Sequence, residues 1–249
     1  MPRIGFLYPG HSAESDYEAF DARLGDGVEL VVVHTLMRED AHRVDALLDV
    51  GSEEVLAAGA RELADLGVDA AVWACTSGSF VFGPQGARTQ VEGVRTAAGV
   101  PASSTSFAFV NAMRQLGKTK VAIAATYPDD VARHFVDFLE AAGITVSSLA
   151  SHGIDTAAEV GRLDADEAVD FVLSNDHSQA EVVLVPDTAL HSAGLIEPLE
   201  GLLGKPVLTA NQVSVWEGLR LAGHSTGRPG PGTLFRTGTD LAGTSPHAR

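Results

Sequence analysis

Two pairs of similar segments follow one another in the same order along the chain, and this internal repeat limits the folds that the chain can adopt. The segments "GVPASSTSFAFVNAMRQLG" (99–117) and "GKPVLTANQVSVWEGLRLAG" (204–223) each run Gly-x-Pro, a short strand, a polar turn and a helix ending in Gly. Ahead of them, "DAAVWACTSGSF" (69–80) and "AEVVLVPDTALH" (180–191) each end an apolar run in a thiol or an acid followed by Thr. Two repeats in one order predict two similar half-units.

Short apolar runs alternate with helical stretches over most of the chain. In the segments between them, such as 51–67 and 129–143, apolar residues recur at helical spacing and the segment closes on Gly. This alternation predicts an α/β fold of two pseudo-symmetric halves, with parallel sheets and a cleft between the halves. The runs expected to form strands are "RIGFLY", "VELVVVHT", "AAVWAC", "VPASS", "KVAIAAT", "TVSSLAS", "AEVVLVPD" and "KPVLTA".

The repeat also suggests where the halves divide. We expect the first half to comprise residues 1–107 together with 211–230, the second half to comprise 108–210, and 231–249 to form a tail. From Ser225 onward the sequence is rich in Gly, Pro and Thr with little periodicity, which predicts a loosely packed surface segment.

Charge and composition exclude several classes of partner. Asp and Glu number 33 against 17 Lys and Arg, and the resulting net charge of −16 repels phosphate backbones and anionic lipid. We therefore expect neither a nucleic-acid partner nor a membrane partner. No apolar run reaches the roughly 18 to 20 residues that span a bilayer, and the N-terminus begins a strand, so we expect a cytoplasmic protein. Asp130 and His134 lie one helical turn apart without a third ligand, so no metal site is expected.

Cys75 is the only cysteine, and it lies where a buried run gives way to Thr76, Ser77, Gly78 and Ser79. Small residues after a strand allow a tight turn that presents N–H groups and hydroxyls to an anionic oxygen. A thiol beside such a nest would have a lowered pKa and act as a nucleophile or proton carrier. The motif alone favours another interpretation, a buried cysteine that behaves as a small apolar side chain.

The repeat changes that balance because it pairs Cys75 with Asp187 and Thr76 with Thr188. Ligands of parallel α/β units bind beyond the carboxyl ends of the strands, so both turns are expected to face one cleft. A thiol and a carboxylate on opposite sides of a substrate suit proton transfer at carbon. Asp187 also fits a helix N-cap, and the two roles are compatible.

The chain resembles the aspartate/glutamate racemase superfamily over about residues 3–223. The resemblance is carried by "CTSGSF" (75–80), "PASSTSFAFVNAMRQLG" (101–117), "AATYPDDVARHFVDFLEAAGITV" (124–146) and "LGKPVLTANQVSVWEGLRLAG" (203–223). More narrowly, it is to the branch of maleate cis-trans isomerases, arylmalonate decarboxylases and ectoine-utilisation proteins. It implies two Rossmann-like halves, no metal or organic cofactor, and two cysteines that face each other across the interdomain cleft.

The family pattern carries over unevenly. The resemblance implies that Cys75 is the first catalytic cysteine and that Thr76 and Ser77 bind a substrate carboxylate. Asp187 stands where the family has its second cysteine, and we expect it to carry a proton. The further candidates for substrate binding are Ser12, Tyr127, Thr188 and Asn211.

Three functions fit these residues, all with a small carboxylic or dicarboxylic acid as ligand. The first is cis-trans isomerisation through covalent addition of Cys75 to a double bond. The second is decarboxylation, with Cys75 as proton donor and Thr76 and Ser77 as the oxyanion site. The third is acid binding without catalysis. Racemisation fits less well, because a carboxylate with a pKa of about 3.9 is a weaker base than a thiolate. Because dimers are the commonest symmetric assembly of soluble proteins, a homodimer is the expected oligomer if the chain forms one.

Overall fold

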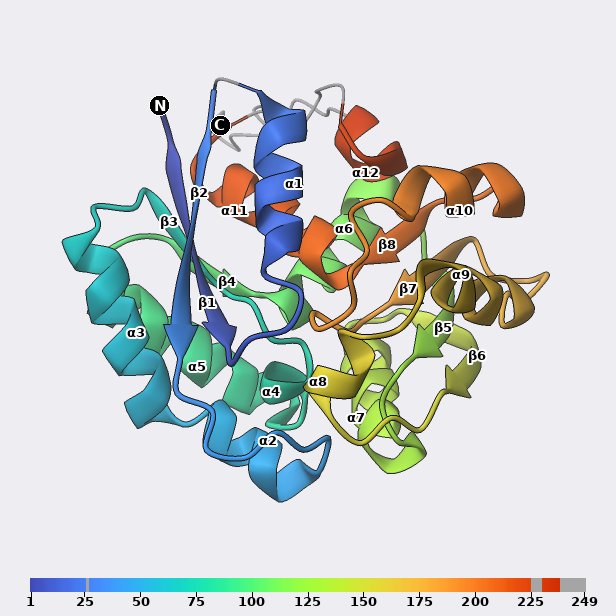
Figure 1. The fold of residues 1–249 in the computed structure, drawn as a ribbon, viewed down its shortest axis with the longest axis horizontal. Coiled ribbons are helices and arrows are strands. Elements are labelled where there is room, and N and C mark those ends of the chain that lie inside the picture. Colours follow the sequence, from blue (N-terminus) through green and yellow to red (C-terminus); the bar gives the residue numbers. More distant parts are fainter. Residues whose placement is uncertain (26, 225–229, 238–249) are drawn as a thin grey trace, which may run out of the picture.

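The structure is a computed structural model that describes residues 1–25, 27–224 and 230–237. The described strands form two parallel four-stranded sheets with the same strand order, β2-β1-β3-β4 and β6-β5-β7-β8 (Figure 1). All eight runs expected to be strands are strands, and the prediction of two pseudo-symmetric α/β halves is confirmed. The strands are β1 (Arg3–Pro9), β2 (Glu29–Thr35), β3 (Ala70–Trp73), β4 (Ala102–Ser104), β5 (Lys120–Ala125), β6 (Thr145–Ser151), β7 (Val182–Val185) and β8 (Val207–Thr209).

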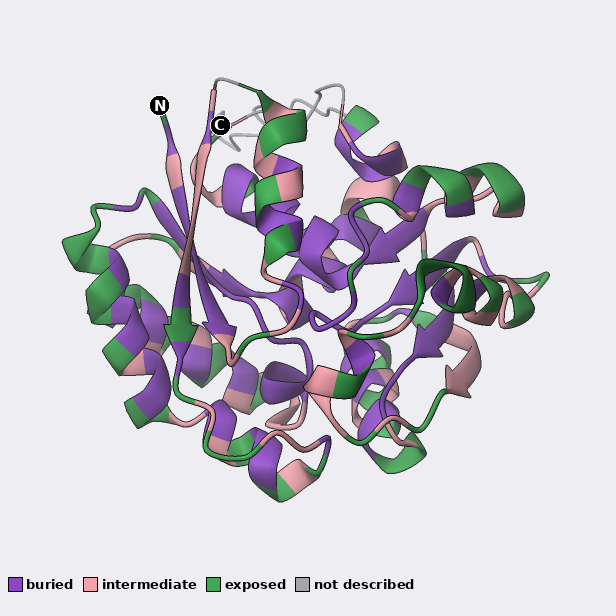
Figure 2. Ribbon diagram, viewed as in Figure 1, coloured by how far each residue is buried: buried purple, intermediate pink, exposed green. Residues whose placement is uncertain are grey.

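Helices flank both sheets. The central strands β3 and β7 are buried along their whole length, because helices cover both faces of a parallel sheet (Figure 2). The helices are α1 (Ser15–Leu24), α2 (Val44–Val50), α3 (Glu53–Asp65), α4 (Ser77–Phe80), α5 (Gly83–Ala98), α6 (Thr105–Leu116), α7 (Asp129–Glu140), α8 (Ala157–Val160), α9 (Ala165–Ser174), α10 (Ile196–Leu203), α11 (Ala210–Leu221) and α12 (Gly232–Arg236).

The repeated Gly-x-Pro segments have a clear conformational reason. Gly99 ends α5 with a φ of 72° and Gly204 ends α10 with a φ of 66°, both in the left-handed region where a side chain is strained. In each half the chain then turns into the edge strand, β4 or β8. The matching glycines therefore stop matching helices and direct matching strands into their sheets.

The helices that follow the edge strands leave their own half and pack across the molecule. α11 follows β8 of the second sheet but packs on the first, where Gly218 touches Ile4 and Val72. α6 follows β4 and packs against α7 through the Phe109–Phe135 ring pair. The two helices also contact each other, with 2.6 Å between the hydroxyls of Thr105 and Ser214.

One hydrophobic cluster joins the two sheets. It contains Ile4 and Val72 of the first sheet together with Ile123 and Leu184 of the second. Because the core is continuous, the division at residues 107/108 and 210/211 stays a prediction. No helix among the described residues is both long enough and apolar enough to cross a bilayer.

The C-terminal segment departs from its prediction within residues 230–237. α12 buries Leu234 and Phe235 completely, and Thr233 N–H donates to the Glu200 carboxylate at 2.9 Å. The expectation of a loosely packed segment was wrong for these residues, because the two apolar side chains pack into the core. The many Gly and Pro residues around them had indicated a loop. The remainder of the expected tail, 225–229 and 238–249, lies outside the described residues.

The close approach of α11 to the first sheet gives a stability prediction. A Cβ at Gly218 would collide with the buried Ile4 side chain, so Gly218→Ala should lower the free energy of unfolding by about 1–3 kcal/mol despite the better helix propensity of Ala. Urea unfolding measures the change. Gly93→Ala on α5 is the matched control, since a Cβ at that position would have no neighbouring atom within 4 Å. Equal stability of the two variants would contradict the packing described.

Candidate active site

Cys75 lies two residues beyond the end of β3, at the entrance to the short helix α4. Its side chain is buried, and the Gly78 N–H donates to Sγ at 3.3 Å. The Ser77 hydroxyl lies 3.8 Å from Sγ. The small residues after the strand therefore form the tight turn that the sequence predicts, and one of its N–H groups points at the sulfur itself.

The environment of Cys75 raises the pKa of the thiol to about 11. Burial is the largest cause, and the negative charge of Asp187 adds to it; the hydrogen bonds from Gly78 and Ser77 act in the opposite direction. The expected lowering of the pKa was wrong, because removal from water disfavours the thiolate more than these two contacts favour it. At neutral pH the group is a thiol.

Asp187 occupies the matching position beyond β7, and its carboxylate is buried. Oδ1 accepts the Ala189 N–H at 2.9 Å, and Oδ2 accepts the Thr126 hydroxyl. The residues that follow form a turn and not a helix, so Asp187 caps a turn where the sequence allowed a helix N-cap. Both oxygens are thereby held in place by atoms that come from different segments.

Cys75 and Asp187 line the same small cavity between the halves. Ser12, Ser77 and Thr188 line it as well, whereas Thr76 lies behind it and is completely buried. The Thr76 hydroxyl forms no well-aligned hydrogen bond within the described residues, and it lies close enough to the Tyr127 hydroxyl to lower the pKa of that phenol. The cavity volume is about 40 Å³, which holds roughly three water molecules.

Two tyrosines flank Asp187 from opposite halves. The Tyr127 hydroxyl donates to the Pro186 carbonyl at 2.7 Å, and the Tyr8 hydroxyl donates to the Thr188 carbonyl at 3.0 Å. Burial raises the pKa of both phenols, and the charges of Asp187 and Cys75 raise it further. Tyr8 lines the cavity and Tyr127 does not. The sequence analysis missed Tyr8, although the matching Tyr-Pro pairs in "LYPG" (7–10) and "TYPD" (126–129) contain the signal.

The side chains of Ser12 and Asn211 donate hydrogen bonds to backbone carbonyls around the cavity. Ser12 Oγ donates to Ala157 O at 3.1 Å and to Ala189 O at 3.0 Å. Asn211 is completely buried, and its Nδ2 donates to Thr188 O at 3.1 Å. Ser12 lines the cavity, whereas Asn211 lies outside the set of residues that line it.

Asp16, a buried carboxylate that the sequence analysis missed, binds the far end of the loop that follows Asp187, at Ser192 and Ala193. Its Oδ2 accepts the Ser192 N–H at 2.8 Å, the Ala193 N–H at 3.1 Å and Asn211 Nδ2 at 3.0 Å. A carboxylate that accepts several N–H groups satisfies donors that would otherwise be buried without partners. Nothing in the local pattern of α1 distinguishes Asp16 from the solvated acids beside it.

The segment 36–43, between β2 and α2, forms one wall of the cavity. The residues that line the cavity include Met37, Glu39, Asp40 and His42 of this segment. Asp40 Oδ1 accepts the N–H of Ala157, which begins α8, at 2.8 Å, and the His42 N–H donates to Asp155 O at 2.7 Å. This segment of the first half is thus hydrogen-bonded to the second half, and it forms one wall of the site.

The cavity carries negative charge. Among the described residues that line it, Glu39, Asp40 and Asp187 are acidic and none is Lys or Arg. A bound carboxylate would therefore be held by hydroxyls and backbone N–H groups and not by an ion pair. Asp40 binds the N-terminus of α8 and Glu39 pairs with Arg43, which leaves Asp187 as the acid that faces the thiol.

A model of the arylmalonate decarboxylase family matches residues 43–235, a range that contains Cys75, Tyr127 and Asp187. The chain belongs to this family. The resemblance inferred from the sequence is therefore confirmed.

Known relatives of the chain have two different activities. The arylmalonate decarboxylase of Bordetella bronchiseptica is 31% identical over 163 residues, which cover 64% of this chain and 68% of the relative. The maleate isomerase of Geobacillus stearothermophilus is 29% identical over 180 residues, covering 70% and 72%. A solved structure of the Nocardia farcinica maleate cis-trans isomerase superimposes with a TM-score of 0.84 at 25% identity, covering 94% of this chain and 98% of that one. That protein is a cysteine-to-serine mutant with a covalently bound succinylcysteine intermediate.

The raised pKa of Cys75 predicts an unusual alkylation profile. Because the thiolate is the species that reacts, the rate of iodoacetamide alkylation should rise with pH up to about 11 in the folded protein, and only to about 8.5 in urea. Asp187→Asn removes a negative charge and should shift the folded profile to lower pH. The chain has one cysteine, so mass spectrometry reports on Cys75 alone.

The raised pKa of Cys75 also makes the free energy of unfolding depend on pH. Since folding raises the pKa of Cys75, its contribution to the free energy of unfolding is complete below about pH 8.5 and declines as the pH rises towards 11. A Cys75→Ser variant should lack this decline. A folded-state midpoint at or below the value in urea would contradict the described burial.

Proposed function

We propose that the protein is a cofactor-independent cis-trans isomerase of a small unsaturated carboxylic or dicarboxylic acid, with Cys75 as the nucleophile. The observation that carries the proposal is the placement of Cys75 and Asp187 on one cavity between the halves, with the Gly78 N–H directed at the sulfur. The relatives support it, because maleate isomerases are among them and one forms a covalent cysteine adduct.

The proposed reaction begins with the transfer of the Cys75 proton. When the substrate displaces water, the thiol proton passes to Asp187 and the thiolate adds to one carbon of the double bond. The neighbouring carbon, now a carbanion stabilised by its carboxylate, takes the proton from Asp187. Rotation about the new single bond follows. Asp187 removes a proton from the same carbon, the C–S bond breaks, and the thiolate recovers its proton as the trans acid leaves.

Hydroxyls and backbone groups would bind the substrate carboxylates. The Ser77 hydroxyl lies on the Cys75 side of the cavity and Thr188 on the Asp187 side, while Thr76, next to Ser77 in the chain, is buried outside the lining residues. Ser12, Tyr127 and Asn211 would act as positioning residues, because each bonds to the backbone that carries Asp187 or its neighbours. Tyr8 would join them on the same argument.

We expect the segment 36–43 to move when the substrate enters, because the cavity volume of about 40 Å³ is small for a four-carbon diacid. The hydrogen bonds of Asp40 and His42 to residues 155–158 are the contacts that opening would break. Closing over the substrate would then exclude water from the thiolate.

Decarboxylation of a malonate-type acid is the second candidate, and the raised pKa of Cys75 favours it. In that reaction the bond to one carboxylate breaks, CO₂ leaves and an enediolate remains. Cys75, protonated at neutral pH, then delivers its proton to carbon, and Asp187 or water returns a proton to the thiolate. The oxyanion would lie against Thr76 and Ser77, as in the first candidate.

We also propose a homodimer and a cytoplasmic location. A catalytic free thiol is kept reduced in the cytoplasm, and dimers are the commonest symmetric assembly. Light scattering of the purified chain measures the assembly directly.

The activity is tested by following maleate and phenylmalonate with the purified protein by NMR. We expect fumarate from maleate, and a drop of at least about a thousandfold in kcat/KM for Cys75→Ala, because the nucleophile is lost. Asp187→Asn should lose about a hundredfold or more, the size of one proton-transfer step. Asp130→Asn, an exposed carboxylate on α7, is the control that should retain full activity.

The outcomes separate the three functions. Fumarate together with a protein mass gain of one maleate on Cys75 supports the isomerase. Phenylacetate from phenylmalonate, without reaction of maleate, supports the decarboxylase. Binding of either acid with no turnover and no alkylation of Cys75 would refute an enzymatic role and leave a carboxylate-binding protein.

A further inference from the structure

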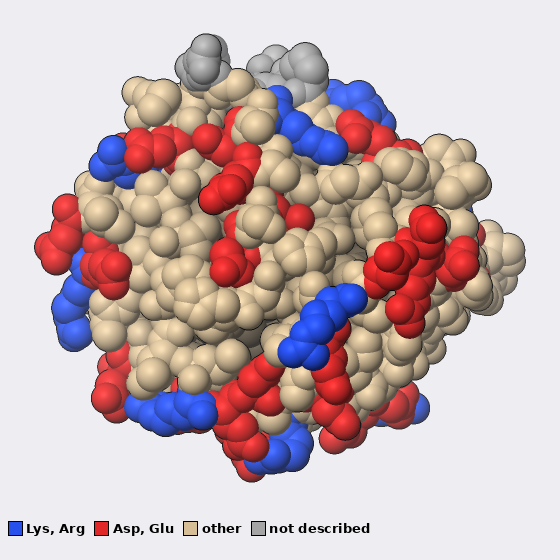
Figure 3. Space-filling view, viewed as in Figure 1, with Lys and Arg blue, Asp and Glu red and all other residues tan. Residues whose placement is uncertain are grey.

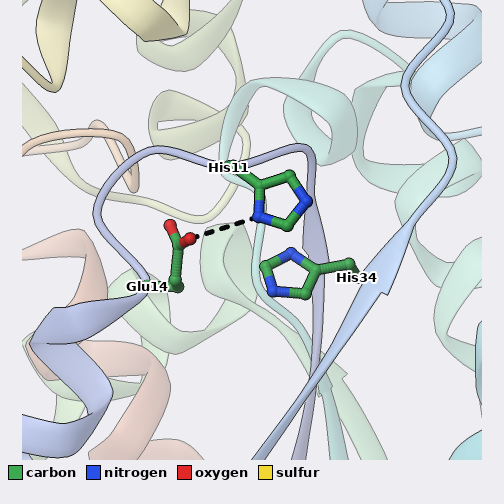
Figure 4. Close-up of side chains that lie close together, drawn as sticks. All are labelled: His11, Glu14 and His34. Atoms are coloured by element: carbon green, nitrogen blue, oxygen red, sulfur yellow. Dashed lines mark hydrogen bonds and ion pairs between the residues drawn. The ribbon is translucent and has the colours of Figure 1, made fainter.

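A second cluster of chemically active side chains lies outside the cavity, on the loop that follows β1. His11 and Glu14 belong to this loop, and His34 is the second-to-last residue of the neighbouring strand β2. Figure 4 shows the two imidazole rings next to each other, with Glu14 beside them. The ring centroids are 4.0 Å apart, and one ligand atom from each of the three residues lies within 4.8 Å of the others.

The backbone around the cluster orients these side chains before any ligand arrives. His34 Nδ1 lies 2.6 Å from the Gly10 carbonyl, an arrangement that makes Nδ1 the donor and leaves Nε2 with its lone pair. Glu14 Oε2 accepts the Ser12 N–H at 2.7 Å, while Oε1 lies 3.2 Å from His11 Nδ1. One oxygen of Glu14 is thus fixed by the loop and the other faces the histidines.

The surroundings attract cations. Glu14 and His34 line a surface hollow of about 380 Å³ whose other charged lining residues are Glu18 and Asp21, with no Lys or Arg among the described residues that form it. Asp21 Oδ1 is buried without a hydrogen-bond partner among the described residues. Figure 3 shows acidic side chains gathered over the region where α1 lies in Figure 1. The negative potential of these carboxylates favours binding of a divalent cation beside the two histidines.

We propose that His11, Glu14 and His34 bind a divalent metal ion of the zinc class. Two imidazoles and one carboxylate form a ligand set that zinc takes in tetrahedral sites, with water in the remaining position. The three ligand atoms lie within 4.8 Å of one another, and the His11 side chain, which is 73% exposed, is free to rotate towards an ion between them. The cluster is distinct from the Cys75 cavity and does not depend on the proposed function.

Occupancy of this site would stiffen the rim of the cavity. Glu14 holds the Ser12 backbone, and the Ser12 hydroxyl in turn binds Ala157 O and Ala189 O. An ion that fixes Glu14 therefore restrains the loop that bridges the two halves beside Asp187. The expected role is structural, with the metal stabilising the folded chain to which it binds.

The test is zinc binding to chelator-treated protein, measured by isothermal titration calorimetry, with cobalt absorption as the coordination signature. We expect one strong site per chain, and at least tenfold weaker binding in both His34→Ala and Glu14→Gln. His134→Ala is the matched control, because His134 lies on α7 and outside the cluster, so this variant should leave binding unchanged. Zinc should also raise the Tm of the wild type but not of His34→Ala.

The side chains in question lie at the surface, so the variants are expected to fold, and circular dichroism checks this. No zinc binding by the wild type, or equal binding by wild type and His34→Ala, would overturn the proposal. Isomerase or decarboxylase activity has no bearing on this result, because the readout is metal binding alone.

Discussion

The geometry of the site depends on how the segment 186–189 is held between the two halves. Backbone carbonyls that are buried need partners, and here the partners are phenols: Tyr127 donates to Pro186 and Tyr8 to Thr188. Asp187 lies between these two anchors. Because Tyr8 lies in a strand of the first sheet and Tyr127 follows a strand of the second, the carboxylate is fixed relative to both halves, and so relative to the thiol.

Charge and burial in the cavity work against ionisation of the thiol, and this shapes what chemistry the site can do. Removal from water and the neighbouring carboxylate both favour the protonated form of Cys75, while the Gly78 N–H favours the thiolate. A thiol that stays protonated at neutral pH, on the same cavity as a carboxylate, gives the site a proton donor and a proton acceptor without a second cysteine.

The sequence predicts the strands and the pairing of Cys75 with Asp187, because both follow from short-range patterns that the repeat displays twice. It does not predict the pKa of Cys75, since desolvation is set by side chains that come from several separate segments. Asp16 was not predicted for a related reason, because its partner Ser192 lies more than 170 residues away. Tyr8 has an equally distant partner, and its only sequence signal is the Tyr-Pro pair that it shares with Tyr127. His34 joins His11 only because β2 lies parallel to β1, so a ligand set that spans two strands has no local motif.

The exchange of α6 and α11 between the halves has a consequence for how the chain is made. On the ribosome, residues 1–104 contain all four strands of the first sheet, yet the helix that covers part of this sheet is α11, near the end of the chain. One face of the first sheet therefore stays partly uncovered until residue 221, the last residue of α11, has left the ribosome. The two halves complete each other late and together, so a truncated chain would expose an apolar sheet face to aggregation.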